Sequence, residues 1–237
     1  SLNGTNLIAV HPAHPPGNRP RVCVGAHLDS VTHSPGADDN GSAVAALLEI
    51  ARVLPTCWPD DAVCDLELIF FDLEESGMLG GAEHARLMSE EKIPLVGMIS
   101  LEMLGYCDHH PGSQTILPGL EGVYPTTGNF IGVVGNSRSL AFRQTFCAGL
   151  TQAEGLPVEW LDVPGNGEVF PPTRLSDHSP FWDRNYPALM VTDTSFLRNP
   201  HYHTANDTWE TLDYNFLQQV THGCLLGVKH VLQFGTR

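Results

Sequence analysis

The chain has 237 residues, 42% of them hydrophobic, which is enough for one sizeable core. Its net charge of −15 argues against nucleic acid as a partner, because surfaces that bind nucleic acid are basic. No apolar segment reaches the roughly 18 residues that a membrane span needs, so we expect no membrane-spanning helix.

We predict a single domain over residues 1–237, since neither low-complexity runs nor internal repeats divide the sequence. The sequence opens SLNGTNLIAV, without an initiator Met or a signal-like region. We therefore expect that a leader or another N-terminal segment is missing.

The six cysteines contain no CxxC pair, which argues against a thiolate zinc knuckle or a thioredoxin-like motif. Cys57 and Cys64 flank WPDDAV in a predicted surface loop, where they could form a local disulfide. The apolar surroundings of Cys23, Cys147 and Cys224 predict buried free thiols.

Short apolar runs alternate with helical patterns along the chain. Strands are predicted at 21–27, 65–72, 96–104, 129–135 and 187–193. Helices are predicted at 41–54, 80–88, about 139–154 and 214–234, and the first is apolar around most of its circumference, as a well-buried helix is. This alternation predicts an α/β fold in which a mostly parallel mixed sheet carries helices on both faces.

Two long stretches lack clear periodicity, at residues 107–128 and 163–173. The first is rich in Gly and Pro. Loops of this length in a compact domain commonly serve as lids or pocket walls. A simple surface excursion is an equally weighted alternative for either loop.

Charged and polar side chains follow three of the predicted strands. His27 and Asp29 stand at the end of the first strand, in GAHLDS. Glu74 and Glu75 lie just past the second, in FFDLEESG, and Glu102 ends the third, in SLEML. Because ligands gather beyond the carboxyl ends of strands in an open α/β sheet, we expect these side chains to meet at one edge.

Two further groups are expected at the same edge. Asp38 and Asp39, in PGADDNGSA, lie between the first strand and the first helix, where Asp39 is also well placed to cap the helix. His201 and His203, in NPHYHTANDTWETLD, follow the last strand. Each group alone is commonplace. Their joint placement indicates a metal site, because crowded carboxylates repel one another unless a cation lies among them.

The residue types suit zinc. Carboxylate and imidazole groups are zinc ligands, and a catalytic zinc keeps an open position for water. Two metals roughly 3.5–4 Å apart need one bridging ligand, which a carboxylate with two oxygens provides. A further acid must stay unligated as the base that takes a proton from water. Asp29 is suitably close to hold the second ring nitrogen of His27.

These residues resemble the co-catalytic di-zinc exopeptidases, a family that includes secreted bacterial leucine-type aminopeptidases, plasma glutamate carboxypeptidase and, more distantly, glutaminyl cyclases. The motifs that carry the resemblance are GAHLDS, PGADDNGSAVAALLE, FFDLEESGMLGG, SDHSPFW and HYHTANDTWETLD, which occur in the family's order between His27 and Asp213. The resemblance implies a zinc exopeptidase-like fold and two zinc ions per chain, with one as an alternative. It also implies an exported protein, periplasmic or secreted.

The resemblance assigns metal ligands to individual residues. It makes Asp39 the ligand shared by both zinc ions. His27 and Glu102 would complete one zinc site, and Glu75 and His203 the other. The family's usual acid at the position of Glu102 is Asp. The glutamate still offers a carboxylate, with one more methylene of reach, so the spacing, preference or occupancy of that metal could differ.

The resemblance also implies catalytic roles. Glu74 would be the general base, and Asp29 would orient His27. Tyr202, beside the last histidine ligand, would stabilise the oxyanion through its phenol group. Asp38 is expected to support its loop rather than to bind metal.

The expected activity is that of a metallo-aminopeptidase that hydrolyses the N-terminal bond of peptides with a free amino terminus, using a metal-activated water and Glu74. An acid-rich site suits a cationic α-amine. A carboxypeptidase would need an Arg or Lys near the cleft, and Arg174 in PPTRLSDHS keeps that activity open. A glutaminyl-peptide cyclase with a single zinc is a further possibility. So is a non-catalytic binding relative, which would require Glu102 to be disabling.

Overall fold

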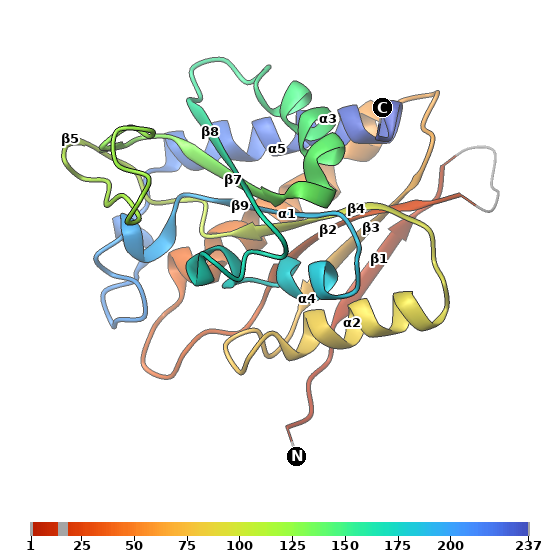
Figure 1. Cartoon of the computed structure of the whole chain (residues 1–237), viewed down its shortest axis with the longest axis horizontal. Helices are drawn as coiled ribbons and strands as arrows, with labels where there is room; N and C mark the ends of the chain where they lie inside the picture. The colour runs from red at the N-terminus through yellow and green to blue at the C-terminus, as the bar shows by residue number, and fades with distance from the viewer. Residues whose placement is uncertain (1, 14–18, 237) are drawn as a thin grey trace.

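The computed structural model describes residues 2–13 and 19–236, and these form one α/β domain around a seven-stranded sheet (Figure 1). The strand order is β1-β3-β2-β4-β9-β7-β8. The strands are β1 (Leu7–His11), β2 (Arg21–His27), β3 (Asp65–Phe71), β4 (Leu95–Glu102), β7 (Ile131–Asn136), β8 (Val158–Val163) and β9 (Ala188–Thr192). A separate two-stranded sheet pairs β5 (Asp108–Pro111) with β6 (Thr127–Gly128).

The four central strands, β3, β2, β4 and β9, are parallel to one another. β7 is antiparallel to β9, β8 is parallel to β7, and β1 is antiparallel to β3. The prediction of a mostly parallel mixed sheet is therefore confirmed. Because of these directions, the carboxyl ends of the four central strands and the amino ends of β7 and β8 lie at the same edge of the sheet.

The two edge strands of the large sheet were not predicted from the sequence. β2, β4 and β9 are buried over almost their whole length, so their apolar residues are consecutive and easily recognised. In β1, Leu7, Ile8 and Val10 are exposed, and in β8 the side chain of Trp160 is exposed. β8 reads VEWLDV, in which charged residues interrupt the apolar ones, so it shows no continuous apolar run. β1 does contain the apolar run LIAV, which was not assigned to a strand.

Helices cover both faces of the sheet. α1 (Ala43–Val53), α3 (Leu140–Leu150) and α5 (Tyr214–Phe234) pack on one face, and α2 (Leu79–Glu90) and α4 (His178–Asp183) on the other (Figure 1). With 6 residues, α4 is too short to show helical periodicity in the sequence. In the described part of the chain, no helix combines the length and the apolar character that crossing a membrane requires.

α3 and α5 approach each other closely at Gly149 and Gly227. A Cβ atom on Gly149 would lie 2.4 Å from the carbonyl oxygen of Leu226 and 2.8 Å from the Cα of Gly227. A Cβ atom on Gly227 would lie 2.5 Å from the ring of Phe146. These helices therefore pack backbone against backbone, which only residues without a side chain permit.

The cysteines are free thiols, and Cys57 and Cys64 do not form the local disulfide that the sequence suggested. Their sulfur atoms are directed at different helices. The Cys57 thiol lies 3.9 Å from the carbonyl of Val53 at the end of α1, and the Cys64 thiol lies 3.9 Å from the carbonyl of Val231 in α5. The prediction that Cys23, Cys147 and Cys224 are buried free thiols is confirmed.

Replacing Gly149 by alanine tests the close packing of α3 on α5. The new methyl group would meet main-chain atoms of α5, which can move only with the helix, so we expect Gly149→Ala to lower the free energy of unfolding by about 1–3 kcal/mol. Urea denaturation at constant pH measures this free energy of unfolding. Gln144→Ala, at an exposed position of the same helix, is the control and should change stability little. A Gly149→Ala variant as stable as the parent protein would contradict this interpretation.

Candidate active site

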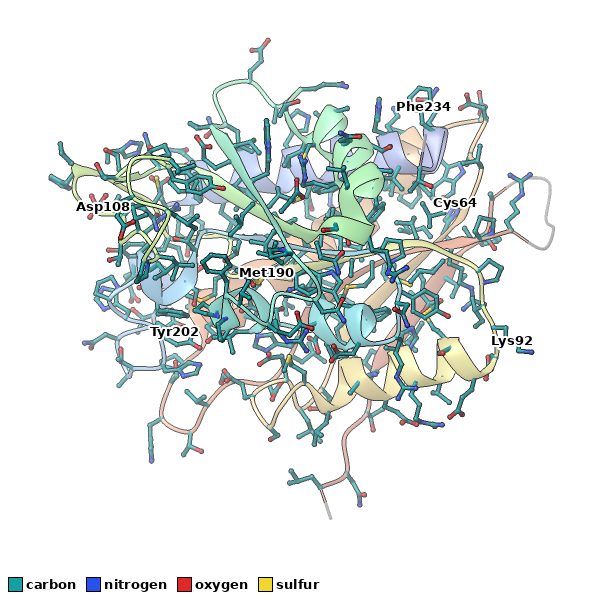
Figure 2. All side chains as sticks on the ribbon, in the orientation of Figure 1. Cys64, Lys92, Asp108, Met190, Tyr202 and Phe234 are labelled. Atoms are coloured by element: carbon teal, nitrogen blue, oxygen red, sulfur yellow. The ribbon has the colours of Figure 1, made fainter. Side chains whose placement is uncertain are left out.

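The predicted ligands come together at one edge of the sheet. β2 ends at His27 and β4 ends at Glu102, while Glu74 and Glu75 follow the end of β3. His203 lies in the loop after β9. Figure 2 shows Tyr202 at the end of the molecule opposite Lys92, which precedes β4, and this is the end where the parallel strands finish.

Asp39 lies between two histidines. Its Oδ1 is 3.2 Å from Nε2 of His27, and its Oδ2 is 3.0 Å from Nε2 of His203. Glu102 Oε1 lies 3.5 Å from Nε2 of His27, and Glu75 Oε2 lies 3.2 Å from Nε2 of His203. Two triads of potential metal ligands therefore share one carboxylate, with the ligand atoms of each triad within 4.8 Å of one another.

The backbone around Asp39 is held by a residue from the far end of the chain. The amides of Asp38 and Asp39 donate to the two oxygens of Asp207, at 2.9 and 3.1 Å. The side-chain amide of Asn40 donates to the carbonyl of Leu101, and its oxygen accepts from an amide just beyond β4. Asp39 is thus tied to both neighbouring ligand-bearing segments. The sequence reasoning missed Asp207, although it lies inside the HTANDTWETLD motif.

Asp38 is placed as loop support, away from both triads. Its buried carboxylate accepts from the Ser42 hydroxyl, the Gly105 amide and the Asn199 side chain. Burial outweighs these hydrogen bonds and raises the pKa of Asp38 above its ordinary value. The loop before α1 is therefore fixed by side-chain contacts on one side and by Asp207 on the other.

Asp29 contacts His27 mainly through its backbone. Its carbonyl oxygen lies 2.9 Å from Nδ1 of His27, whereas its carboxylate is 3.6 Å from the same nitrogen. The carboxylate oxygens instead accept the amides of Glu74 and Glu75, at 2.9 and 3.1 Å. Asp29 therefore positions three members of the site at once, and the sequence indicated only one of these contacts.

Glu102 reaches the site despite its extra methylene. Its Oε1 faces His27, while its Oε2 accepts a 2.7 Å hydrogen bond from the hydroxyl of Ser176. The hydroxyl of Ser100 lies 2.7 Å from that of Ser176 and extends this buried chain of contacts. Ser176 opens the SDHSPFW motif, whose hydrogen-bonding role the sequence did not reveal.

Burial and the charges of neighbouring groups shift the pKa values of several groups in the site. Burial and then the charge of Glu102 raise the pKa of Glu74 to about 9. Burial and then the carboxylate of Asp39 raise the pKa of Glu75 to about 7. Burial works to lower the pKa of His27, but the neighbouring carboxylates, Glu102 foremost, raise it well above its ordinary value.

The donor set fits a divalent metal at each triad. Oxygen and imidazole nitrogen are the ligands that zinc takes in catalytic sites. Oε1 of Glu75 is buried and, among the described residues, has no hydrogen-bond partner. A buried polar atom of this kind is costly unless something binds it. A cation between the acids would satisfy this oxygen and relieve the mutual repulsion.

A cavity of about 300 Å³ adjoins the triads and has mostly apolar walls. Both long loops contribute to it, the first through residues such as Leu117 and Tyr124 and the second through Thr173, so they form a pocket wall. Glu74 and Tyr202 also line the cavity, and the ring of Tyr202 stacks on that of His203 at 3.7 Å between centroids.

Within the ranges that the structure describes, no Lys or Arg lines this cavity. Arg174, the candidate cation for a carboxypeptidase, is engaged elsewhere. Its guanidinium donates to the carbonyl of Asn166 at 2.7 Å and to the carboxylate of Asp183 at 2.8 Å. All charged side chains in the described lining of the cavity are therefore negative, and the remaining residues are apolar or neutral.

Comparison with known proteins agrees with this arrangement. A profile of peptidase family M28 matches residues 6–228. The chain is 38% identical over 224 residues to the uncharacterized protein YfbL of Escherichia coli, covering 89% of this chain and 67% of that protein. It is 29% identical over 203 residues to aminopeptidase YwaD of Bacillus subtilis, covering 84% of this chain but 38% of that protein.

Solved structures show the same fold. The zinc aminopeptidase BSAP of Bacillus subtilis superposes with a TM-score of 0.74 at 23% identity, covering 98% of this chain and 51% of that one. LapA aminopeptidase of Legionella pneumophila superposes with a TM-score of 0.73 at 21% sequence identity, and the match covers 98% of this chain and 55% of that one. The glutaminyl cyclase of Porphyromonas gingivalis superposes with a TM-score of 0.63 at 21% sequence identity, and the match covers 95% of this chain and 77% of that one. The chain thus spans about half the length of these aminopeptidases.

The raised pKa of Glu74 predicts how the stability of the metal-free protein depends on pH. The folded state binds this proton more tightly than the unfolded state, whose glutamate has a pKa of 4.5. The stability that the protonated carboxyl of Glu74 contributes to the folded state is therefore complete below pH 4.5 and is lost as pH rises towards about 9. Denaturation of the metal-free protein across this range should show stability falling, and Glu74→Gln should weaken the dependence. Glu91→Gln, an exposed acid, is the control, and equal slopes in both variants would refute the assignment.

The contacts of Asp207 predict an effect on metal binding by a residue that is not a ligand. Asp207→Ala removes the acceptor for the amides of Asp38 and Asp39, so Asp39 is no longer held between the histidines. We expect about a 10–100-fold loss of zinc affinity, measured by competition with a chelator. Asn206→Ala, at the exposed neighbouring position, should bind zinc as the parent protein does. Unchanged affinity in Asp207→Ala would show that the loop holds its shape without this residue.

Proposed function

This chain belongs to peptidase family M28, and on that premise we propose that it is a zinc-dependent aminopeptidase that removes the amino-terminal residue from peptides. The observation that carries the proposal is the position of Asp39, whose two oxygens each face a histidine of a different triad. Glu74 lines the adjoining cavity and belongs to neither triad, which leaves it available as a base.

We propose that two zinc ions bind per chain. His27, Asp39 and Glu102 would hold one, and the second would share Asp39 with Glu75 and His203. A catalytic zinc with three protein ligands keeps a position for water or substrate. A carboxylate with one oxygen towards each triad suits the bridge of a two-metal site.

Proton transfer falls to Glu74. Bound zinc would supply a Lewis acid that polarises the scissile carbonyl and lowers the pKa of water. Glu74 takes the proton from the attacking water and returns it to the departing amine, which its place in the cavity beside both triads allows. Tyr202, held by stacking on His203, donates its phenol hydrogen bond to the developing oxyanion.

The charge of the cavity supports recognition of an amino terminus. A cationic α-amine is attracted to walls that carry Glu74, Glu75 and Glu102. A substrate that presents its carboxyl terminus would need a cationic side chain, and the described lining of the cavity contains none. The aminopeptidase is therefore favoured over the carboxypeptidase.

A cyclase and a non-catalytic binding protein are less well supported. A glutaminyl cyclase shares the fold, but two complete triads around one shared carboxylate favour chemistry with two metals. A non-catalytic relative would lack the base or a metal ligand. This chain has the base Glu74 and all five triad residues, and Glu102 lies 3.5 Å from His27. Export, which the resemblance implies, stays a prediction, and free Cys57 and Cys64 do not add to it.

Metal content and hydrolysis together test the proposal. After chelator treatment and reloading, we expect about two zinc per chain and hydrolysis of aminoacyl amides. Glu74→Gln should retain the metal and lose activity by several orders of magnitude, because only the proton acceptor is removed. Elemental analysis and initial rates on a panel of amides are the measurements. Glu91→Gln makes the same charge change on the surface and should stay active.

A different result would change the assignment. One zinc per chain without amide hydrolysis would favour the cyclase, which is then tested with a peptide that begins with glutamine. Two zinc ions without hydrolysis of any amide would favour a binding relative.

A further inference from the structure

A row of four residues crosses the sheet from the metal ligands to the outermost strand. The register pairs Glu102 of β4 with Thr192 of β9, Thr192 with Gly132 of β7, and Gly132 with Glu159 of β8. All four residues line the cavity. Since neighbouring strands lie about 4.8 Å apart, three spacings separate Glu102 from Glu159, or about 14 Å. The cavity therefore has a carboxylate at each end of this row.

The two residues in the middle of the row, Thr192 and Gly132, are small. Gly132 has no side chain, and a Cβ atom placed there would meet the carbonyl oxygen of Thr192 at 3.3 Å and other atoms only at 3.7 Å or more. Thr192 is small. This floor leaves room for an extended group that runs from the triads towards Glu159.

The charge of Glu159 is not compensated by the protein. Among the residues that the structure describes, no cationic side chain forms an ion pair with it, although it is partly buried. The nearest guanidinium along β8, that of Arg143, pairs with Asp162 at 2.7 Å and lies over the ring of Trp160. Trp160 and Asp162 alternate with Glu159 along the strand, so Arg143 lies on the opposite face of the sheet.

Apolar side chains make up much of the cavity lining. They include Ile116, Leu117, Leu120, Phe130 and Leu175. A mostly apolar cavity with an unpaired carboxylate in its lining matches a long side chain with an aliphatic stem and a cationic tip, which is the chemistry of lysine and arginine.

We propose that the cavity binds the side chain of an N-terminal lysine or arginine and that Glu159 determines this specificity by accepting the cationic tip. The inference rests on the proposed aminopeptidase function, in which the α-amine and the scissile carbonyl lie at the triads. A leucine side chain fills only the apolar part and forms no charge pair with Glu159, so it gains nothing from that carboxylate. An acidic side chain is repelled.

Lysine amide and norleucine amide form the matched pair of substrates, because norleucine has a linear aliphatic stem without the ammonium group. For the zinc-loaded protein we expect kcat/KM to be about tenfold or more higher for lysine amide, since the charge pair forms inside the cavity. In Glu159→Gln this ratio should fall by about tenfold, with little change for norleucine amide. Glu154→Gln, an exposed acid just after α3, carries the same charge change and should keep the parent ratio.

A binding measurement separates this inference from the proposed function. Calorimetric titration of the zinc-loaded Glu74→Gln protein with lysine amide and norleucine amide reports recognition without turnover. Tighter binding of lysine amide, reduced by adding Glu159→Gln, supports the specificity even if no amide is hydrolysed. Equal binding of the two amides, or a preference that survives Glu159→Gln, overturns it, and hydrolysis of norleucine amide in that case leaves the aminopeptidase intact.

Discussion

The functional edge depends on hydrogen bonds that occupy some of its carboxylates and leave others free. The two carboxylate oxygens of Asp29, and likewise those of Asp207, accept hydrogen bonds from two consecutive backbone amides. Those amides belong to segments that carry other acids of the site. Hydrogen bonds from amides stabilise the charged form of a carboxylate. These hydrogen bonds lower the pKa of Asp29 despite its burial, whereas burial raises the pKa of Asp207, and both acids act as anchors for the backbone. Asp39 and Glu75 point their oxygens at the shared space between the histidines, so the negative charge that attracts metal is concentrated there.

The reversed direction of β7 brings part of the cavity lining to the same edge as the triads. In a fully parallel sheet the edge would collect only carboxyl ends of strands, where loops supply the ligands. Because β7 is antiparallel to β9, and β8 follows it, the amino ends of these strands reach the same edge. Gly132 and Glu159 lie near those amino ends and form the floor of the cavity. The triads and part of the cavity lining thus come from opposite ends of strands in one sheet.

The sequence predicted the parts of the molecule that local patterns determine. Continuous apolar runs located β2, β4 and β9, and the motifs brought His27, Asp39 and His203 to one edge. The edge strands β1 and β8 were missed, β8 because charged residues interrupt its apolar ones and β1 although it contains the short apolar run LIAV. Glu159 could not be found in this way, because its place opposite Glu102 depends on the register of strands that are not consecutive in the chain. The anchoring of Asp39 by Asp207 is likewise a tertiary contact without a local signal.

The hydrogen bonds from Asp38 and Asp39 to Asp207 span 169 and 168 residues. Contacts of such separation form only after the intervening chain has been placed, so they belong to the slow, non-local part of folding. During synthesis, β2, β3 and β4 leave the ribosome well before residue 207 does. A nascent chain then carries several of the acids and histidines but lacks the residue that orders the shared ligand. The arrangement of the two triads around one carboxylate is consequently a property of the finished domain.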